Sequence, residues 1–106
     1  MSISGELATV HFTAPFSPFQ DDIFISLGTS YIKYITICNT YHAEADLKLY
    51  IKTDANYKIF EKQGIAVQGL AYLEIPIILK NGHQLIAEAD AQNITFDFTI
   101  SYGKEA

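Results

Sequence analysis

Hydrophobic and polar residues alternate along much of this chain. The longest alternating run covers residues 94–102, where five apolar residues take turns with four polar ones. Successive side chains of a β-strand point to opposite faces, so this run predicts a strand with one face in a core. We expect Phe96, Phe98 and Ile100 to be buried, and Thr95, Asp97 and Thr99 to face water or a partner.

Shorter segments alternate in the same way or are rich in β-branched and aromatic residues, which favour strands. These segments are residues 7–12, 23–27, 31–38, 46–53, 57–60, 70–75 and 84–89. The side chains expected to share a face are Ala8, Val10 and Phe12; Ile23, Ile25 and Leu27; and Leu47, Leu49 and Ile51. Segment 31–38 is apolar on both faces, which indicates a central strand or one covered by a neighbouring subunit.

These strands predict an all-β fold. Turn residues separate them, and Asn81-Gly82 has the composition of a type I′ hairpin turn. No window longer than ten residues has a helical period, and Gly64 and Gly69 disfavour a helix between 61 and 70. The sequence predicts one domain over residues 1–106, a single antiparallel β-sandwich or jelly-roll-like fold of about eight strands.

Residues 14–22 interrupt this pattern of strands. Two prolines remove backbone donors, so the segment cannot be a central strand, yet it carries Phe16 and Phe19. Either the two rings cover an open end of their own sandwich, or the segment is an arm that docks in another subunit, since exposed apolar groups mark interaction sites. We expect Phe19, which is nearer to the next strand, to close its own sandwich and Phe16 to reach a partner.

Composition and charge exclude several classes of function. The chain has 12 acidic residues against 7 lysines and no arginine, which gives a formal net charge of −5. Nucleic-acid binding needs a basic surface and usually arginine, so no nucleic-acid partner is expected. No apolar run approaches the about 20 residues of a membrane helix. The first residues also lack the pattern of a signal peptide, so we expect a protein made and folded in a cytosol, without a membrane.

Residues that could carry chemistry are sparse. His11, His42 and His83 lie in three separate segments, and the chain has neither a Gly-x-Ser-x-Gly elbow nor a Gly-rich phosphate loop. Cys38 lies in an apolar strand and is expected to be a buried structural thiol. Segment 42–46 is the best metal candidate, but in an extended strand its imidazole and two carboxylates spread over about 13 Å. The sequence therefore predicts no enzyme activity, no cofactor and no metal site.

Aromatic residues supply the candidate interface. The chain has seven Tyr and seven Phe but no Trp, the residue that usually stacks on sugars, so a glycan is the less favoured partner. Tyrosine is enriched at protein–protein interfaces because it joins an apolar ring to a polar tip. The candidate interface residues are Phe16, Phe19, Tyr31, Tyr34, Tyr41, Tyr50 and Tyr57.

The order of several segments resembles a known group of proteins. Residues 35–39 lead into a hairpin and residues 47–51, and then follow the apolar run 73–79, the turn at 80–85 and the final alternating strand. Over residues 31–102 this order resembles the small β-sandwich structural proteins of tailed-bacteriophage virions. That group includes tail, neck, fibre-attachment and capsid-decoration components.

The resemblance implies a structural subunit of a virion, made in the host cytoplasm, with no catalytic residues to carry over. Such a subunit would form a homo-oligomer, as a trimer or ring, and bind other virion structural proteins. The low charge and the two-sided apolar strand agree with this, because obligate interfaces are more apolar than free surfaces. The alternative function is a receptor- or glycan-binding module displayed on the virion.

Overall fold

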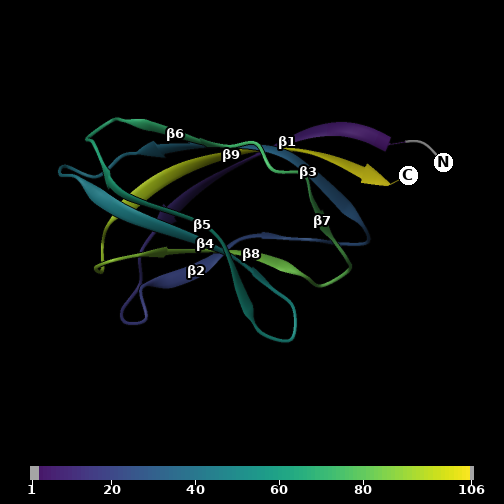
Figure 1. The fold of residues 1–106 in the computed structure, drawn as a ribbon, viewed down its shortest axis with the longest axis horizontal. Coiled ribbons are helices and arrows are strands. Elements are labelled where there is room, and N and C mark those ends of the chain that lie inside the picture. The colour runs from purple at the N-terminus through teal and green to yellow at the C-terminus, as the bar shows by residue number, and fades with distance from the viewer. Residues whose placement is uncertain (1–2, 106) are drawn as a thin grey trace.

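The computed structural model describes residues 3–105, which form two antiparallel sheets packed face to face as the upper and lower layers of Figure 1. This part of the chain contains nine strands and no helix, so none of its elements is a helix able to cross a membrane. Sheet A has the order β1 (Ile3–Thr13), β9 (Thr95–Glu105), β3 (Ser30–Asn39) and β6 (Leu70–Leu73), with β7 (Ile77–Leu79) also paired to β3. Sheet B has the order β2 (Gln20–Ile25), β8 (Gln84–Ala89), β4 (Ala45–Lys52) and β5 (Asn56–Ile65).

The alternating run near the C-terminus forms the centre of the core. β9 lies between β1 and β3, and its inward Phe96, Phe98 and Ile100 are at most 1% exposed. The Phe98 ring meets that of Phe12 on β1 edge to face, with centroids 6.2 Å apart. The side chains between them, Thr95, Asp97 and Thr99, face outward. The predicted all-β sandwich and the register of its last strand are therefore confirmed.

Sheet B supplies the other half of the core. On β4, Leu47 and Leu49 are fully buried and Ile51 packs against the core at its margin, as the alternation predicts. On β8, Leu85 and Ala87 are also fully buried. The pattern of residues 7–12 is confirmed as well: Phe12 is buried, and Ala8 and Val10 pack against the core.

The prediction for residues 23–27 is wrong. β2 ends at Ile25, and its pairing with β8 shifts register between Asp22 and Phe24. An extra residue in one strand turns the side chains that follow it to the opposite face. Ile23 is buried, but Ile25 and Leu27 are 48% and 68% exposed, so these three side chains do not share an inward face.

The ninth strand, β7, was not expected from the sequence. β6 and β7 both pair with β3, at Cys38–Ile35 and at Ile32–Ser30 respectively, so together they form one edge of sheet A in two pieces. Residues 74–76 separate the pieces. Pro76 has no backbone donor, which is one reason for a break within an edge strand.

Two local expectations also need correction. Only Gly82 of the Asn81-Gly82 pair has a positive φ, at 85°, whereas a type I′ turn requires positive φ at both central residues. Cys38 is not a core thiol: it is half-buried on the outer face of sheet A, because the alternation of β3 points Ile37 and Asn39 inward.

Asn39 joins the loops at one end of the sandwich. Its side chain is fully buried, and Nδ2 donates to the carbonyl oxygens of Ala43 and Ile65 at 3.0 and 2.8 Å. Oδ1 accepts a hydrogen bond from the backbone nitrogen of Tyr41 at 2.8 Å. Buried polar groups are stable only when paired, so this one amide fixes the loop after β3 against the end of β5.

Changing Phe98 to Ala tests the core. Removing a fully buried ring should lower the free energy of unfolding by about 3 to 5 kcal/mol. The outward-facing Thr99→Ala is the matched control on the same strand and should stay near the wild-type value. Chemical denaturation measures both, and equal stability of the two variants would contradict the register of β9.

Changing Asn39 to Ala tests the buried amide. The variant leaves two carbonyl oxygens and one backbone N–H without their partner, which should cost about 1 to 3 kcal/mol. The neighbouring Thr40→Ala, at an exposed position, is the control. Thermal unfolding measures both variants. If both have the melting temperature of the wild-type chain, Asn39 does not hold these loops.

Candidate functional site: interaction surfaces

The seven candidate interface residues do not lie on one surface. Tyr31 and Tyr34 lie on the outer face of sheet A, whereas Tyr50 and Tyr57 belong to β4 and β5 of sheet B. The remaining three are in loops at one end of the sandwich: Phe16, Phe19 and Tyr41. The seven residues therefore fall into three groups: sheet A, sheet B and the loop end.

The two phenylalanines of the Pro-containing loop have different environments. Phe16 is 81% exposed, whereas Phe19 is half-buried and packs against the core. The backbone nitrogen of Phe19 donates to the Phe16 carbonyl at 3.2 Å, and the Phe19 carbonyl accepts from Ala89 at 3.1 Å. β2 already begins at Gln20, so the connection is a short loop over residues 14–19 rather than an arm over 14–22.

Tyr50 and Tyr57 are engaged within their own chain. The Tyr50 hydroxyl donates to Oε2 of Glu88 at 3.4 Å, and burial, followed by the charge of that carboxylate, raises the pKa of Tyr50. The Tyr57 hydroxyl donates to Asp54 at 3.1 Å, which raises the pKa of Tyr57. Tyr41 packs against the core, and its ring lies 4.1 Å from that of His42.

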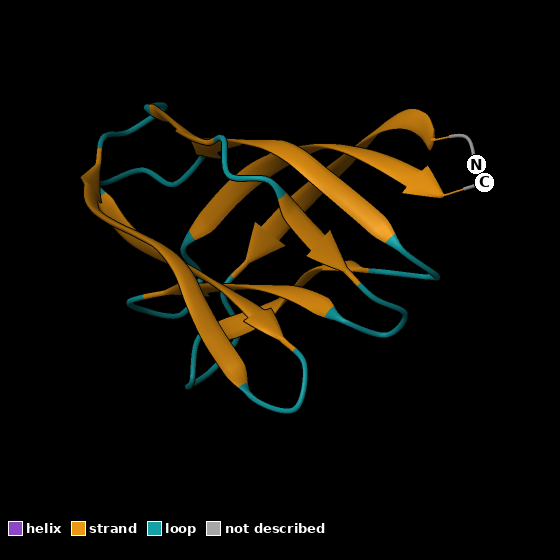
Figure 2. Cartoon of the chain, turned by 45° about the vertical axis from the view of Figure 1, so that its right-hand side comes forward, coloured by secondary structure: helices purple, strands orange, loops and turns teal. Residues whose placement is uncertain are grey.

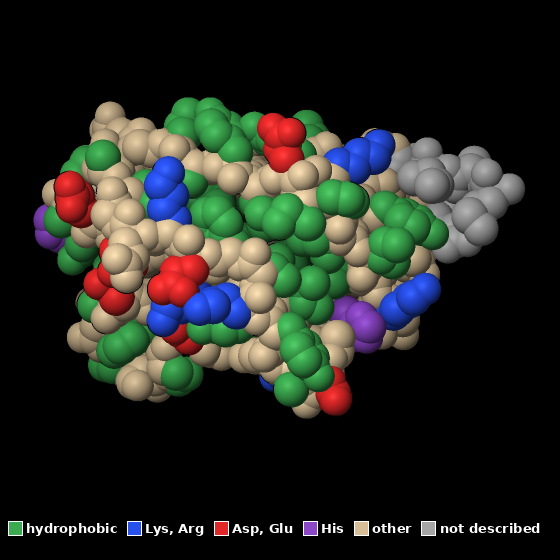
Figure 3. All heavy atoms as spheres, viewed as in Figure 1, with side chains coloured by type: hydrophobic (Ala, Val, Ile, Leu, Met, Phe, Trp, Pro, Cys, Tyr) green, Lys and Arg blue, Asp and Glu red, His purple; other side chains and the backbone are tan. Residues whose placement is uncertain are grey.

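The outer face of sheet A carries an apolar patch that we call the β3–β6–β7 patch. Tyr34 and Tyr72 pack with ring centroids 5.7 Å apart, and the register places Ile78 beside Tyr31 and Leu70 beside Cys38. Leu70, Tyr72 and Ile78 each remain about half exposed. In Figure 3, which views the sandwich from the side, hydrophobic side chains gather around β6 and β7 with single charged side chains among them.

The outer faces of the two sheets differ in charge. In sheet B, Glu88 accepts from Gln20 at 2.6 Å and lies 3.9 Å from the Lys48 ammonium, and Lys58 pairs with Glu61 at 2.6 Å. The described strands of sheet A have mainly Thr and Tyr on this face, with one ion pair between His11 and Asp97. Sheet A therefore presents the surface that costs less to remove from water.

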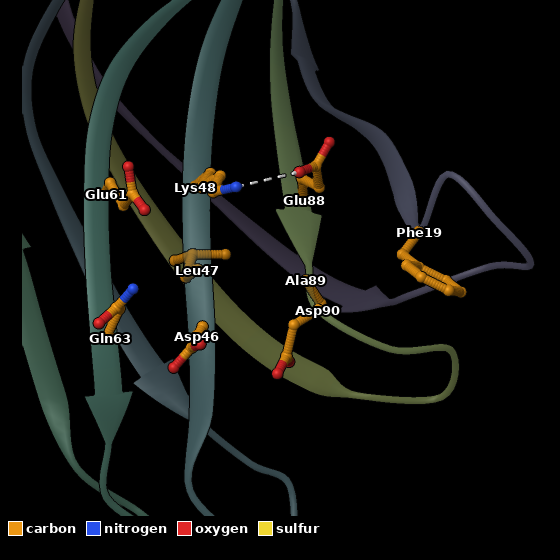
Figure 4. A pocket seen from close by; sticks show the side chains of 9 residues that line it. All are labelled: Phe19, Asp46, Leu47, Lys48, Glu61, Gln63, Glu88, Ala89 and Asp90. Carbon is orange, nitrogen blue, oxygen red and sulfur yellow. Dashed lines mark ion pairs between the residues drawn. The ribbon is translucent and has the colours of Figure 1, made fainter.

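A shallow pocket of about 230 Å³ opens on sheet B, between β5, β4 and the end of β8. Figure 4 shows Asp46 and Lys48 on the central strand, Glu61 and Gln63 on one side, and Glu88 and Asp90 on the other. Two of its carboxylates already have partners, since Asp46 accepts from the Gly64 nitrogen at 2.8 Å and Glu88 faces Lys48. The pocket is also smaller than the about 300 to 1,000 Å³ of usual ligand sites.

The side chains considered for metal binding lie apart. Within residues 3–105, no three His, Cys, Asp or Glu side chains converge closely enough to hold a metal ion. The His42 ring packs at a tilt of 44° against that of Tyr41, and Asp46 accepts a hydrogen bond from the backbone of β5. The three histidines also stay in separate places, with His83 bonded through Nδ1 to the Lys80 nitrogen at 3.1 Å.

Sequence reasoning missed the exposed apolar residues of the sheet A edges: Leu7, Leu70, Tyr72, Ile75 and Ile78. A signal for most of them was present, because 70–73 and 77–79 are apolar on both faces like segment 31–38. β6 and β7 pair with β3 through residues more than 30 positions apart in the chain. The periodicity of hydrophobic residues does not reveal such pairings.

Comparison with known proteins gives a fold match only. No protein-family profile matches the chain, and no curated protein sequence matches it. The fold is similar to a chain in the acidic stable capsid structure of Helicobacter pylori bacteriophage KHP30, with a TM-score of 0.73 and 10% identity, over 96% of this chain and 89% of that chain. A second likeness, to the T13 IBDV viral particle, has a TM-score of 0.43 and 7% identity over 93% of this chain and 31% of that chain, too low to add to the argument.

The loop phenylalanines give a test of the two expected roles. Phe19→Ser should lower the free energy of unfolding by about 1 to 3 kcal/mol, because its ring packs on the core. Phe16→Ser removes an exposed ring and should leave the melting temperature unchanged. Thermal unfolding of the two single variants measures this, and matching melting temperatures would refute the division of roles.

Proposed function

We propose that this chain is a structural protein of a tailed-bacteriophage virion that assembles with copies of itself and with other virion subunits. The observation that carries the proposal is the likeness to a chain of a bacteriophage capsid, which extends over 96% of this chain and 89% of that one. A match that leaves so little of either chain uncovered favours an equivalent unit rather than a shared fragment. It also favours the capsid over the neck or tail as the location.

The strand order supports the finer description of the sandwich as a jelly roll. The strands pair in a nested way: β1 with β9, β2 with β8, β3 with β6 and β7, and β4 with β5. This nesting is what results when one long hairpin rolls up into two sheets, as in the jelly rolls of viral capsid domains. β1 and β9 are the first and last strands of the hairpin, and Figure 2 shows them reaching toward the two termini.

The surfaces support assembly rather than catalysis. The β3–β6–β7 patch gives sheet A a half-exposed apolar surface next to outward threonines, among which His11 and Asp97 form one ion pair. Exposed apolar patches of this kind mark protein contacts. We therefore assign the outer face of sheet A to contacts with other virion subunits, and the exposed Phe16 to a further contact at the loop end.

A receptor- or glycan-binding module is the second candidate, and the Tyr34–Tyr72 pair is the feature that favours it. Two exposed rings with centroids 5.7 Å apart could stack on a sugar. A glycan array with the isolated chain separates the two functions. Specific glycan binding without affinity for virus particles would replace the structural role by the receptor role.

Co-sedimentation with particles tests the structural role. Recombinant chain, mixed with virions from the source of this sequence that have been stripped of it, should pellet with them in a saturable manner. Mass spectrometry of untreated virions should find its peptides in stoichiometric amount. Absence of the chain from purified virions would overturn the proposal.

Two exposed tyrosines provide a matched pair of variants for the same assay. Tyr72 in the patch and Tyr57 on sheet B are 51% and 53% exposed. Tyr72→Ser should weaken particle binding by about tenfold or more, as for a central interface tyrosine, and Tyr57→Ser should not change it. Circular dichroism verifies that both variants are folded, and equal loss of binding would remove sheet A from the contact.

A further inference from the structure

The edges of the two sheets differ in how well they are protected. Sheet A ends at β1 and at β6–β7, and sheet B ends at β2 and β5. A free edge presents a row of unpaired N–H and C=O groups on which another strand can form. Proteins block such edges with bulges, prolines, very short strands or charged side chains, above all lysines.

Three of the four edges carry such devices. β2 has a register shift between Asp22 and Phe24. β5 has two register shifts against β4 and bears the charged residues Lys58, Glu61 and Lys62. The β6–β7 edge is split by residues 74–76 into strands of 4 and 3 residues.

β1 has no bulge, proline or lysine, and Glu6 is its one acidic residue. It has 11 residues, and its register with β9 runs without a shift from Ile3–Glu105 to Thr13–Thr95. Within residues 3–105, β9 is the one strand that pairs with it. Leu7 on its outer face is 71% exposed. β1 is therefore a long, regular and uncovered edge.

We propose that β1 pairs antiparallel with β1 of a second copy of this chain, which makes sheet A continuous across a two-fold axis. The proposal specifies how the self-association proposed above takes place and rests on it. A second copy is the occupant because a two-fold contact uses the same edge twice, whereas a ring built by strand pairing needs two different free edges. The other three edges each carry a protecting device, so these sheets offer no second free edge from which a ring could be built.

Full overlap of the two strands places the axis at Ala8. Each strand is about 36 Å long at 3.3 Å per residue, which is most of the 45 Å longest dimension of the molecule. Leu7 then lies opposite Thr9 of the second copy, on the same outer face. The strand's one carboxylate, Glu6, lies opposite Val10, about 13 Å along the strand from its symmetry mate, beyond one Debye length at physiological salt.

The pairing also extends the surface assigned to capsid contacts. Leu7 stands beside Ser101, and Ser101 beside Tyr34, so the outer row runs from the β1 edge to the β3–β6–β7 patch. Joining two β1 edges produces one continuous outer face with an apolar patch at each end. A dimer of this form offers two equivalent contacts to a capsid, which raises its apparent affinity without new contacts.

Analytical ultracentrifugation of the full chain tests the pairing. Wild-type chain should sediment as a dimer of the 11.8 kDa chain. Leu7→Lys places a lysine on the edge strand, and the two lysines of a dimer would occupy diagonal positions about 7 to 8 Å apart across the axis. The variant should therefore weaken dimerisation by at least about 100-fold. Leu70→Lys makes the same change at an exposed leucine of the opposite edge and should leave the dimer intact.

Hydrogen exchange of the wild-type chain covers the case in which Leu7→Lys fails to fold. Alternate backbone amides of β1 face away from β9. In a paired dimer these amides should be protected from exchange, and their protection should rise with chain concentration. A monomeric wild-type chain that still binds particles would overturn this inference alone and leave the virion role in place. A dimer that is broken by Leu70→Lys and not by Leu7→Lys would also overturn the inference. Protection of the β1 amides only on particles would overturn it as well and would indicate that β1 pairs with a strand from another virion protein.

Discussion

The fold depends on the burial of β9 between β1 and β3, with its inward rings against sheet B. Phe96, Phe98 and Ile100 are almost fully removed from water and belong to the one core cluster that both sheets share. Burial of each such side chain is worth about 1.5 to 3 kcal/mol, against a net stability of about 5 to 15 kcal/mol for a whole domain. Because β9 takes the interior position, β1 is left at the edge and the threonines of β9 form the outer face.

The elements with regular period-two alternation could be predicted from the sequence, since burial of one face dictates that pattern. The last strand and the inward leucines of β4 have this origin. The bulge at Asp22 could not be predicted, because it is set by pairing with β8, more than 60 residues away. Asn39 escaped notice because its role depends partly on the carbonyl group of Ile65, which belongs to a distant segment, and nothing in the local pattern marks a buried amide.

The sequence named Tyr and Phe residues as candidates for an interface, but it could not group them by face. The structure distributes them over both sheets and one loop end. Tyr50 turned out to be bonded to Glu88, whereas Tyr34 gained Tyr72 as a neighbour through the β3–β6 pairing. The physical distinction lies between the two outer faces: sheet B is linked by its own ion pairs and hydrogen bonds, and sheet A exposes threonine, tyrosine and aliphatic groups.

Cryo-electron microscopy of virions from the source of this sequence tests the structural role in the virion. We expect density for the nine-strand sandwich at repeated positions on the capsid, with the outer face of sheet A turned toward neighbouring subunits. Virions without this sandwich would refute the structural role, and virions with sheet A facing solvent and sheet B in contact would refute the assignment of sheet A to subunit contacts.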